Sequence, residues 1–201
     1  MKYSICVSGA AGGETVKRDH ELAERLGVAV AKSKNILTTG ATVGLPFFAA
    51  RAAHLAGGMS IGFSPASSLL EHVHKYRLPI GMYDYINFTG LNYVGRDVYL
   101  VQSSDALVTV GGRFGSLHEF STALESNMPC GVLTGSGGAA DEIPELIDKL
   151  GRNHKHMIVF DDNPERLITE IIKMLDEHNK GIDTTALANQ WFVTDPPMRA
   201  G

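Results

Sequence analysis

Short β-branched runs alternate with stretches of helical periodicity along most of the chain, and this alternation is what most constrains the fold. Strands are expected at residues 3–9, 35–40, 59–64, 82–88, 106–110, 130–134 and 156–160. Helices are expected at residues 15–33, 44–58, 93–104, 115–127, 141–151 and 163–178, and residues 65–79 are expected to be helical in part. Strands that alternate with helices in this way pair in parallel through right-handed crossovers. The sequence therefore predicts a single α/β domain over residues 1–180, a doubly wound parallel sheet in three layers.

The last residues, 181–201, lose the alternation and are expected to form a C-terminal tail. This segment contains Trp191 and Phe192, two large aromatic side chains that suit docking on the domain or on a partner subunit. The simpler interpretation is a tail that these side chains order in part by themselves.

The composition indicates a soluble cytoplasmic protein whose partners include neither nucleic acid nor a membrane. The 201 residues carry a formal net charge of −4, whereas nucleic-acid surfaces need clustered Lys and Arg. No apolar run approaches the ~18 residues of a membrane span, and the N-terminus reaches glycines too early for a signal peptide. Cys6 and Cys130 lie in apolar segments, which favours buried thiols in a reducing compartment.

Three glycine-rich turns follow expected strands, at residues 8–15, 38–46 and 111–116. In a parallel sheet all three lie at the carboxyl edge, where a glycine turn that enters a helix offers backbone N–H groups to an anion. They predict a phosphate or nucleotide ligand, although glycine is also common in tight turns that bind nothing. The candidate phosphate-binding or nucleotide-binding residues are Gly9, Gly12, Gly13, Gly40, Gly44, Gly111, Gly112, Arg113, Gly115 and Ser116.

The spacing of these glycines excludes two familiar nucleotide sites. The chain has no GxxxxGK[ST] pattern, so it lacks the loop and the lysine of a P-loop NTPase. The first glycine turn does not match GxGxxG, and no acidic residue ends the second expected strand to bind a ribose of NAD.

The third turn carries a longer pattern that resembles a known family. Residues 111–119 are similar to the GG-x-[YF]-G-[ST]-x-x-E motif of the LOG (Lonely Guy) and DprA-related Rossmann-like proteins, many of which were labelled "possible lysine decarboxylase". Arg96 stands nine residues before Asp105, at the spacing of the arginine in the family's Arg-Lys pair. Residues 38–58 also resemble the family's GG-x-x-G-[LV]-M block, and the likeness extends over about residues 1–175.

The resemblance implies a nucleoside 5′-monophosphate phosphoribohydrolase, which cleaves the N-glycosidic bond and releases the base and ribose 5-phosphate. It implies phosphate binding by Gly112, Gly115 and Ser116, and catalysis by Glu119 and Arg96, in a homodimer or larger homo-oligomer without a cofactor. The chemistry is compatible with this assignment, because a carboxylate near C1′ can stabilise positive charge on the ribose or activate water.

The chain departs from the family pattern where the lysine after the arginine is expected. Asp97 occupies that position and replaces a positive charge with a negative one, while His118 precedes Glu119 where an acidic residue is common. The charge of Arg113 can compensate in part for the missing lysine. The alternative is therefore a Rossmann-like protein that binds a nucleotide or a phosphorylated cofactor without cleaving it.

Simpler structural roles remain open for several of these residues. Ser116 and Glu119 form an S-x-x-E pattern, which is also that of a helix capping box. His118 is expected to point about 100° away from Glu119 around the helix, in an exposed or capping role. His72 and His74 do not share a helix face, so no metal site is expected. The expected core includes Tyr83 and Tyr85, for which stacking on a base is the alternative.

Overall fold

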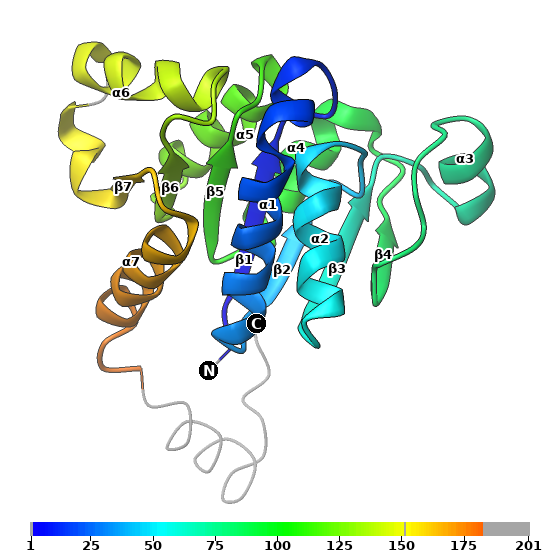
Figure 1. Cartoon of the computed structure of the whole chain (residues 1–201), viewed down its shortest axis with the longest axis horizontal. Coiled ribbons are helices and arrows are strands. Elements are labelled where there is room, and N and C mark those ends of the chain that lie inside the picture. Colours follow the sequence, from blue (N-terminus) through cyan, green and yellow to red (C-terminus); the bar gives the residue numbers. More distant parts are fainter. Residues whose placement is uncertain (1, 151, 183–201) are drawn as a thin grey trace, which may run out of the picture.

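The computed structural model describes residues 2–150 and 152–182, and it forms one doubly wound α/β domain (Figure 1). Its seven strands are all parallel and follow the order β4-β3-β2-β1-β5-β6-β7. The strands are β1 (Ser4–Gly9), β2 (Ile36–Thr39), β3 (Met59–Ser64), β4 (Tyr85–Phe88), β5 (Ala106–Val110), β6 (Cys130–Leu133) and β7 (Ile158–Asp161). The predicted fold class is confirmed.

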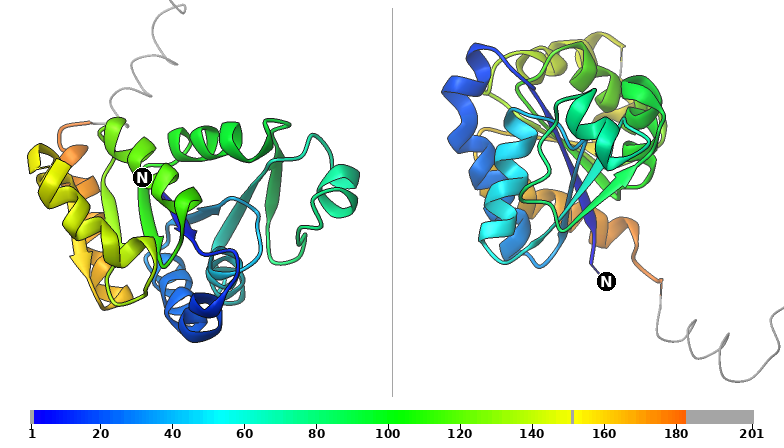
Figure 2. Two further views of the ribbon diagram at one scale, coloured as in Figure 1. Left: turned by 90° about the horizontal axis from the view of Figure 1, so that it is seen from above. Right: turned by 90° about the vertical axis from the view of Figure 1, so that its right-hand side faces the viewer.

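Six α-helices lie between these strands in the described part of the chain, and a seventh follows β7. They are α1 (Glu14–Lys32), α2 (Leu45–Leu55), α3 (Leu69–His74), α4 (Asn92–Gln102), α5 (Phe114–Glu125), α6 (Ala139–Leu150) and α7 (Pro164–His178). A 3-10 helix, Arg152–Met157, precedes β7. Helices α1, α2 and α7 cover one face of the sheet, and α4, α5 and α6 cover the other (Figure 2).

The alternation of side chains along β1 shows how one strand supplies both layers of the core. Ile5 and Val7 are fully buried against α1, α2 and α7, while Cys6 between them is buried against the opposite helix layer. Successive side chains of a strand point to opposite faces, so a strand that is covered on both sides must be apolar throughout. The carboxyl ends of the strands are thereby fixed at one edge of a rigid sheet.

Two helix starts differ from the sequence-based expectation. Helix α1 begins at Glu14 with Gly13 as its N-cap, so Thr15 does not cap it. Helix α5 begins at Phe114 with Arg113 at the N-cap position, and no side chain caps it. Ser116 therefore lies inside the first turn, and the capping box considered for Ser116 and Glu119 does not form. Both side chains are therefore available for other contacts.

The core prediction was wrong for one of the two tyrosines. Tyr85 begins the edge strand β4 and is 60% exposed, whereas Tyr83 precedes that strand and packs against the core beside α1 and α2. His72 is buried, with Nδ1 2.8 Å from Ser64 Oγ and Nε2 3.0 Å from the carbonyl oxygen of Pro79. It fastens the segment after α3 to the end of β3.

The C-terminal tail predicted at 181–201, with Trp191 and Phe192, lies outside the described residues except for its first two positions. Within the described ranges, no helix has the length and apolar character needed to cross a membrane.

Candidate functional site

A pocket of about 270 Å³ opens at the carboxyl edge of the sheet, above the strands β1, β2 and β5. The chain leaves β1 toward β2 on one side, and β5 lies on the other, so this is the topological switch point where open α/β sheets bind ligands. We call it the glycine-loop pocket. It is lined by Val7, Ser8, Gly9, Ala10, Ala11, Gly40, Thr42, Pro46, Tyr93, Arg96, Asp97, Arg113, Gly115, Ser116 and Glu119.

The structure brings seven of the twelve candidate site residues to this pocket, from all three glycine turns and from α4. They are Gly9, Gly40, Arg96, Arg113, Gly115, Ser116 and Glu119. The other five, Gly12, Gly13, Gly44, Gly111 and Gly112, are not among its lining residues. Gly44 has a structural reason to be glycine, because its φ is +81° and a Cβ there would overlap the carbonyl oxygen of Ala10.

Helices that begin beside the pocket lack the usual side-chain caps. In the described chain, α1, α2, α4 and α5 have no N-cap side chain that accepts a hydrogen bond from their first turn. By contrast α3 and α7, which contribute no residue to the pocket, are capped by Ser68 and Asn163. Uncapped N–H groups and the positive end of the helix dipole together favour a bound anion.

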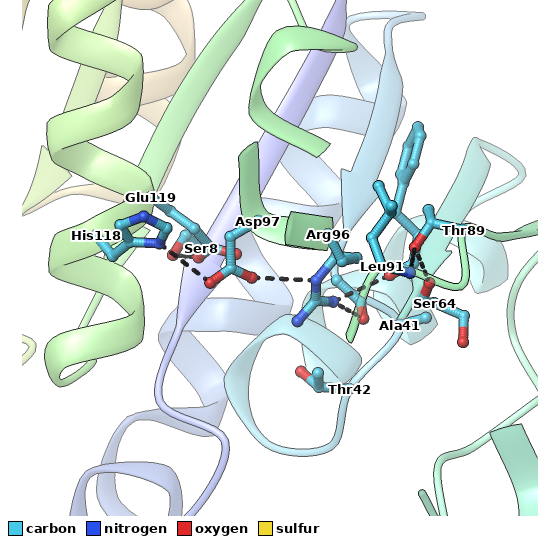
Figure 3. A network of polar contacts seen from close by, with 12 residues as sticks. Ser8, Ala41, Thr42, Ser64, Thr89, Leu91, Arg96, Asp97, His118 and Glu119 are labelled. Atoms are coloured by element: carbon cyan, nitrogen blue, oxygen red, sulfur yellow. Dashed lines mark hydrogen bonds and ion pairs between the residues drawn. The ribbon is translucent and has the colours of Figure 1, made fainter. Parts of the chain in front are cut away.

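Arg96 is buried in the pocket wall, where it joins three elements (Figure 3). Its Nη1 donates to the carbonyl oxygens of Gly40, after β2, and of Phe63, in β3, the latter at 3.0 Å. Its Nε donates to Asp97 Oδ1 at 3.1 Å. A Cβ at Gly40 would overlap the guanidinium, which explains the glycine at that position. Most of the N–H donors of the guanidinium are therefore engaged in hydrogen bonds within the protein.

Asp97 and Glu119 form a buried acidic pair beside Arg96. Ser8 Oγ donates to Glu119 Oε2. Burial and then the negative charge of Asp97 raise the pKa of Glu119, Arg96 opposes both effects, and the resulting pKa is about 7. Glu119 is therefore close to half protonated at neutral pH.

His118 is partly exposed and does not contact Glu119, but it does contact Asp97. Its Nδ1 lies 3.3 Å from Asp97 Oδ2, and its side chain is about 40% exposed. The contact arises because α4 packs beside α5, which brings Asp97 under the flank of the neighbouring helix. Asp97 thus contacts both Arg96 and His118 and occupies the space expected for a lysine.

A fourth glycine turn, residues 135–138, supports the site, although it was not singled out in the sequence. Ser136 Oγ accepts a hydrogen bond from the N–H of Gly111 at 2.8 Å. The N–H groups of Ala139 and Ala140 donate to the carbonyl oxygens of Gly112 and Gly111. The signal was present as a Gly-Ser-Gly-Gly stretch after an expected strand. Ser8 was also missed, although it stands at the start of the first glycine turn.

A doubly wound sheet with a glycine-loop pocket at its switch point defines a Rossmann-like protein. The pattern of its loops identifies it further: the chain belongs to the SLOG cluster4 family, whose sequence model matches residues 2–168. The resemblance to LOG and DprA-related proteins predicted from the third glycine turn is thereby confirmed.

Three similar proteins illustrate what is known of such chains. An uncharacterised protein of Archaeoglobus fulgidus is 31% identical over 121 residues, which cover 60% of this chain and 73% of the relative. The molybdenum cofactor binding protein from Rippkaea orientalis is 28% identical, with a TM-score of 0.73 over 87% of this chain and 98% of its own. The molybdenum cofactor carrier protein from Chlamydomonas reinhardtii is 26% identical, with a TM-score of 0.71 over 87% of this chain and 99% of its own.

Proposed function

We propose that this protein binds a phosphorylated small molecule, a nucleoside monophosphate or a phosphorylated cofactor, and holds it without cleaving it. The observation that carries the proposal is the convergence of uncapped helix N-termini and glycine turns on one pocket, with Arg113 at its edge. A helix N-terminus contributes up to ~2 kcal/mol to the binding of an anion in a favourable, partly buried geometry. Several such termini suit a phosphate group even though no lysine is present at the position of Asp97.

The internal contacts of Arg96 and Glu119 support binding over cleavage. The Arg96 side chain is committed to two carbonyl oxygens and to Asp97, and Glu119 accepts a hydrogen bond from Ser8. Asp97 also adds a negative charge to the wall of the glycine-loop pocket. Two solved relatives are described as a binding protein and a carrier protein of the molybdenum cofactor.

The glycine at position 115 offers a direct test of phosphate binding. A Cβ added to Gly115 meets nothing within 4 Å, yet this residue lines the glycine-loop pocket. We expect Gly115→Leu to weaken the binding of AMP and of inorganic phosphate at least about tenfold, because the side chain enters the anion site. The melting temperature should be unchanged or higher, since glycine costs a helix ~1 kcal/mol relative to better helix formers. Calorimetric titration and thermal melting measure the two effects.

The matched control is Gly81→Leu, because Gly81 also has open space around its Cα but lies outside the pocket. It should bind both ligands as the wild type does. Undiminished phosphate binding by Gly115→Leu would exclude the glycine-loop pocket as the anion site. To identify the ligand, AMP, GMP and the isolated molybdenum cofactor are titrated separately into the wild type, and their affinities are compared.

Hydrolysis of a nucleoside monophosphate is the second candidate, and one observation favours it. The Glu119 pKa of about 7 suits a general acid or base at neutral pH, and the side chain lines the pocket. The test is to incubate the wild type with a panel of nucleoside monophosphates and to assay free base and ribose 5-phosphate. Release that is present in the wild type and abolished in Glu119→Gln would establish the enzyme. Release that persists unchanged in that variant would exclude Glu119 as its catalytic group.

A further inference from the structure

A second cleft lies between α5 and α6, directly beside the glycine-loop pocket. Its volume is about 510 Å³, and its walls include Phe114 and Leu117 from α5 and Ala139 and Leu146 from α6. The cleft exists because the α6 entry is held close to the third glycine turn. A Cβ at Gly138 would overlap the carbonyl oxygen of Gly112, so the two turns touch while the helices diverge beyond them.

Two apolar side chains of this cleft, Phe114 and Leu146, lie outside the buried core. Helix α6 buries Ala139, Ala140, Ile143 and Ile147 toward the body of the domain, whereas Leu146 lies outside this buried set. Phe114 is the first residue of α5 and its side chain is 88% exposed. A large aromatic side chain in contact with water at the mouth of a cleft is available for burial by a ligand.

The two cavities meet at the start of α5, because Arg113 lines both of them. The glycine-loop pocket is the more polar of the two cavities and, at about 270 Å³, smaller than the ~300–1,000 Å³ of typical small-molecule sites. The α5–α6 cleft is apolar and has room for a ring system. An anion bound at the N-terminus of α5 would therefore lie beside an apolar cavity that is large enough for a ring system.

The charges at the rim of the cleft restrict what enters it. Helix α6 places Glu142, Glu145 and Lys149 there, and Lys149 pairs with Glu145. Arg113, on the α5 side, balances Glu142, so the charged residues that line the cleft have no net charge. Such a lining suits an uncharged heterocycle whose N–H groups can donate to a carboxylate.

We infer that the α5–α6 cleft binds the heterocyclic ring of the phosphorylated ligand, with the ring against Phe114 and Leu117 and the phosphate at the N-terminus of α5. This inference rests on the proposed function, since it requires the phosphate site. It adds a consequence for the chemistry: neither Glu119 nor Arg96 lines the cleft. A ring bound there lies outside the pocket that contains the acidic pair, as suits a protein that holds its ligand intact.

The test compares ligands that share a phosphate but differ in their rings. Inorganic phosphate, ribose 5-phosphate, AMP and riboflavin 5′-phosphate are titrated calorimetrically into the wild type and into Phe114→Ala, whose exposed position leaves the fold intact. In the wild type, AMP and riboflavin 5′-phosphate should bind more tightly than ribose 5-phosphate. In Phe114→Ala they should bind about tenfold more weakly, the loss expected for an aromatic contact in an interface. Inorganic phosphate and ribose 5-phosphate should bind as before.

Two further variants serve as controls. Phe114→Tyr keeps the aromatic face and should retain the affinity for both ring-bearing ligands. Tyr85→Ala removes an exposed aromatic side chain on the edge strand β4, outside both cavities. It should leave the affinity for all four ligands unchanged. Equal loss for all four ligands in Phe114→Ala, or no loss for any, would overturn the ring site while leaving the phosphate site standing. If the wild type binds none of the four, the proposed function fails together with the inference.

Discussion

Arg96→Met is expected to lower the free energy of unfolding by about 3–5 kcal/mol, the typical cost of removing one partner from a buried ion pair. The substitution keeps most of the side-chain volume but removes the donors to Gly40 and Phe63 and leaves Asp97 without its buried cation. For a chain of this size, such a loss lowers the melting temperature by roughly 10 °C. Thermal and urea unfolding followed by circular dichroism measure it.

The matched control is Arg25→Met, in which the same change is made at the surface. Arg25 makes a bidentate pair with Glu165, and both side chains are about half exposed. Exposed pairs contribute ~1 kcal/mol or less, so this variant should unfold close to the wild type. In the Arg96→Met background, Asp97→Asn should restore part of the stability because it removes the unpaired buried charge. If Arg96→Met is no less stable than Arg25→Met, Arg96 does not have the structural role described above.

Arg96 links β2, β3 and α4 through its hydrogen bonds, and this structural role explains why an aspartate can stand at position 97 in place of the family's lysine. Asp97 supplies the negative charge that balances the buried guanidinium, and its second oxygen contacts His118. The pair is thus nearly neutral as a unit and adds little net attraction for an anion. In the proposed phosphate site, the attraction for the anion would therefore come from backbone N–H groups and from Arg113, which the glycine turns place there.

The fold could be predicted because the central strands β1, β5 and β6 are buried almost throughout and therefore appear in the sequence as largely apolar runs. The switch point followed from the same reasoning, since carboxyl ends of parallel strands share one edge, and Gly9, Gly40 and Gly115 do line one pocket. The start of α5 was harder to predict from the sequence. Ser116 and Glu119 match a capping box at the level of residue types, but the helix begins at Phe114, with Arg113 rather than Ser116 at the N-cap position.

Contacts between helices could not be read from a single periodic pattern. The helical period correctly separates His118 from Glu119 around α5, yet it contains no information on which residue of α4 lies opposite. The Asp97–His118 contact and the hydrogen bond from Ser8 to Glu119 depend on how two helices and a strand pack together. The same limit applies to the α5–α6 cleft, which follows from the approach of Gly138 to Gly112 across two separate turns.

Glu119 should make the stability of the protein depend on pH in a defined window. Its pKa is raised from 4.5 to about 7, so the native state holds a proton that the unfolded chain releases above about pH 4.5. Stability falls with pH wherever the native state binds more protons than the unfolded state. The contribution of Glu119 therefore decreases as the pH rises from about 4.5 to about 7 and is constant above that range. Asp97, Arg96 and His118 surround this carboxyl and are shared by wild type and variant.

Glu119→Gln mimics the protonated carboxyl, because the amide oxygen can still accept from Ser8 and the group carries no charge. The variant should match the wild type near pH 4.5 and be more stable by about 3 kcal/mol at pH 8, since the pKa rises from 4.5 to about 7 and one pKa unit corresponds to ~1.4 kcal/mol. Urea unfolding at several pH values gives this difference directly. Glu125→Gln, on the exposed end of the same helix, is the control and should show no such trend. A constant difference between Glu119→Gln and the wild type from pH 5 to pH 8 would mean that Glu119 is ionised throughout. It would then be an acceptor in the pocket rather than a proton donor, which weakens any general-acid step and leaves binding as the function that this geometry supports.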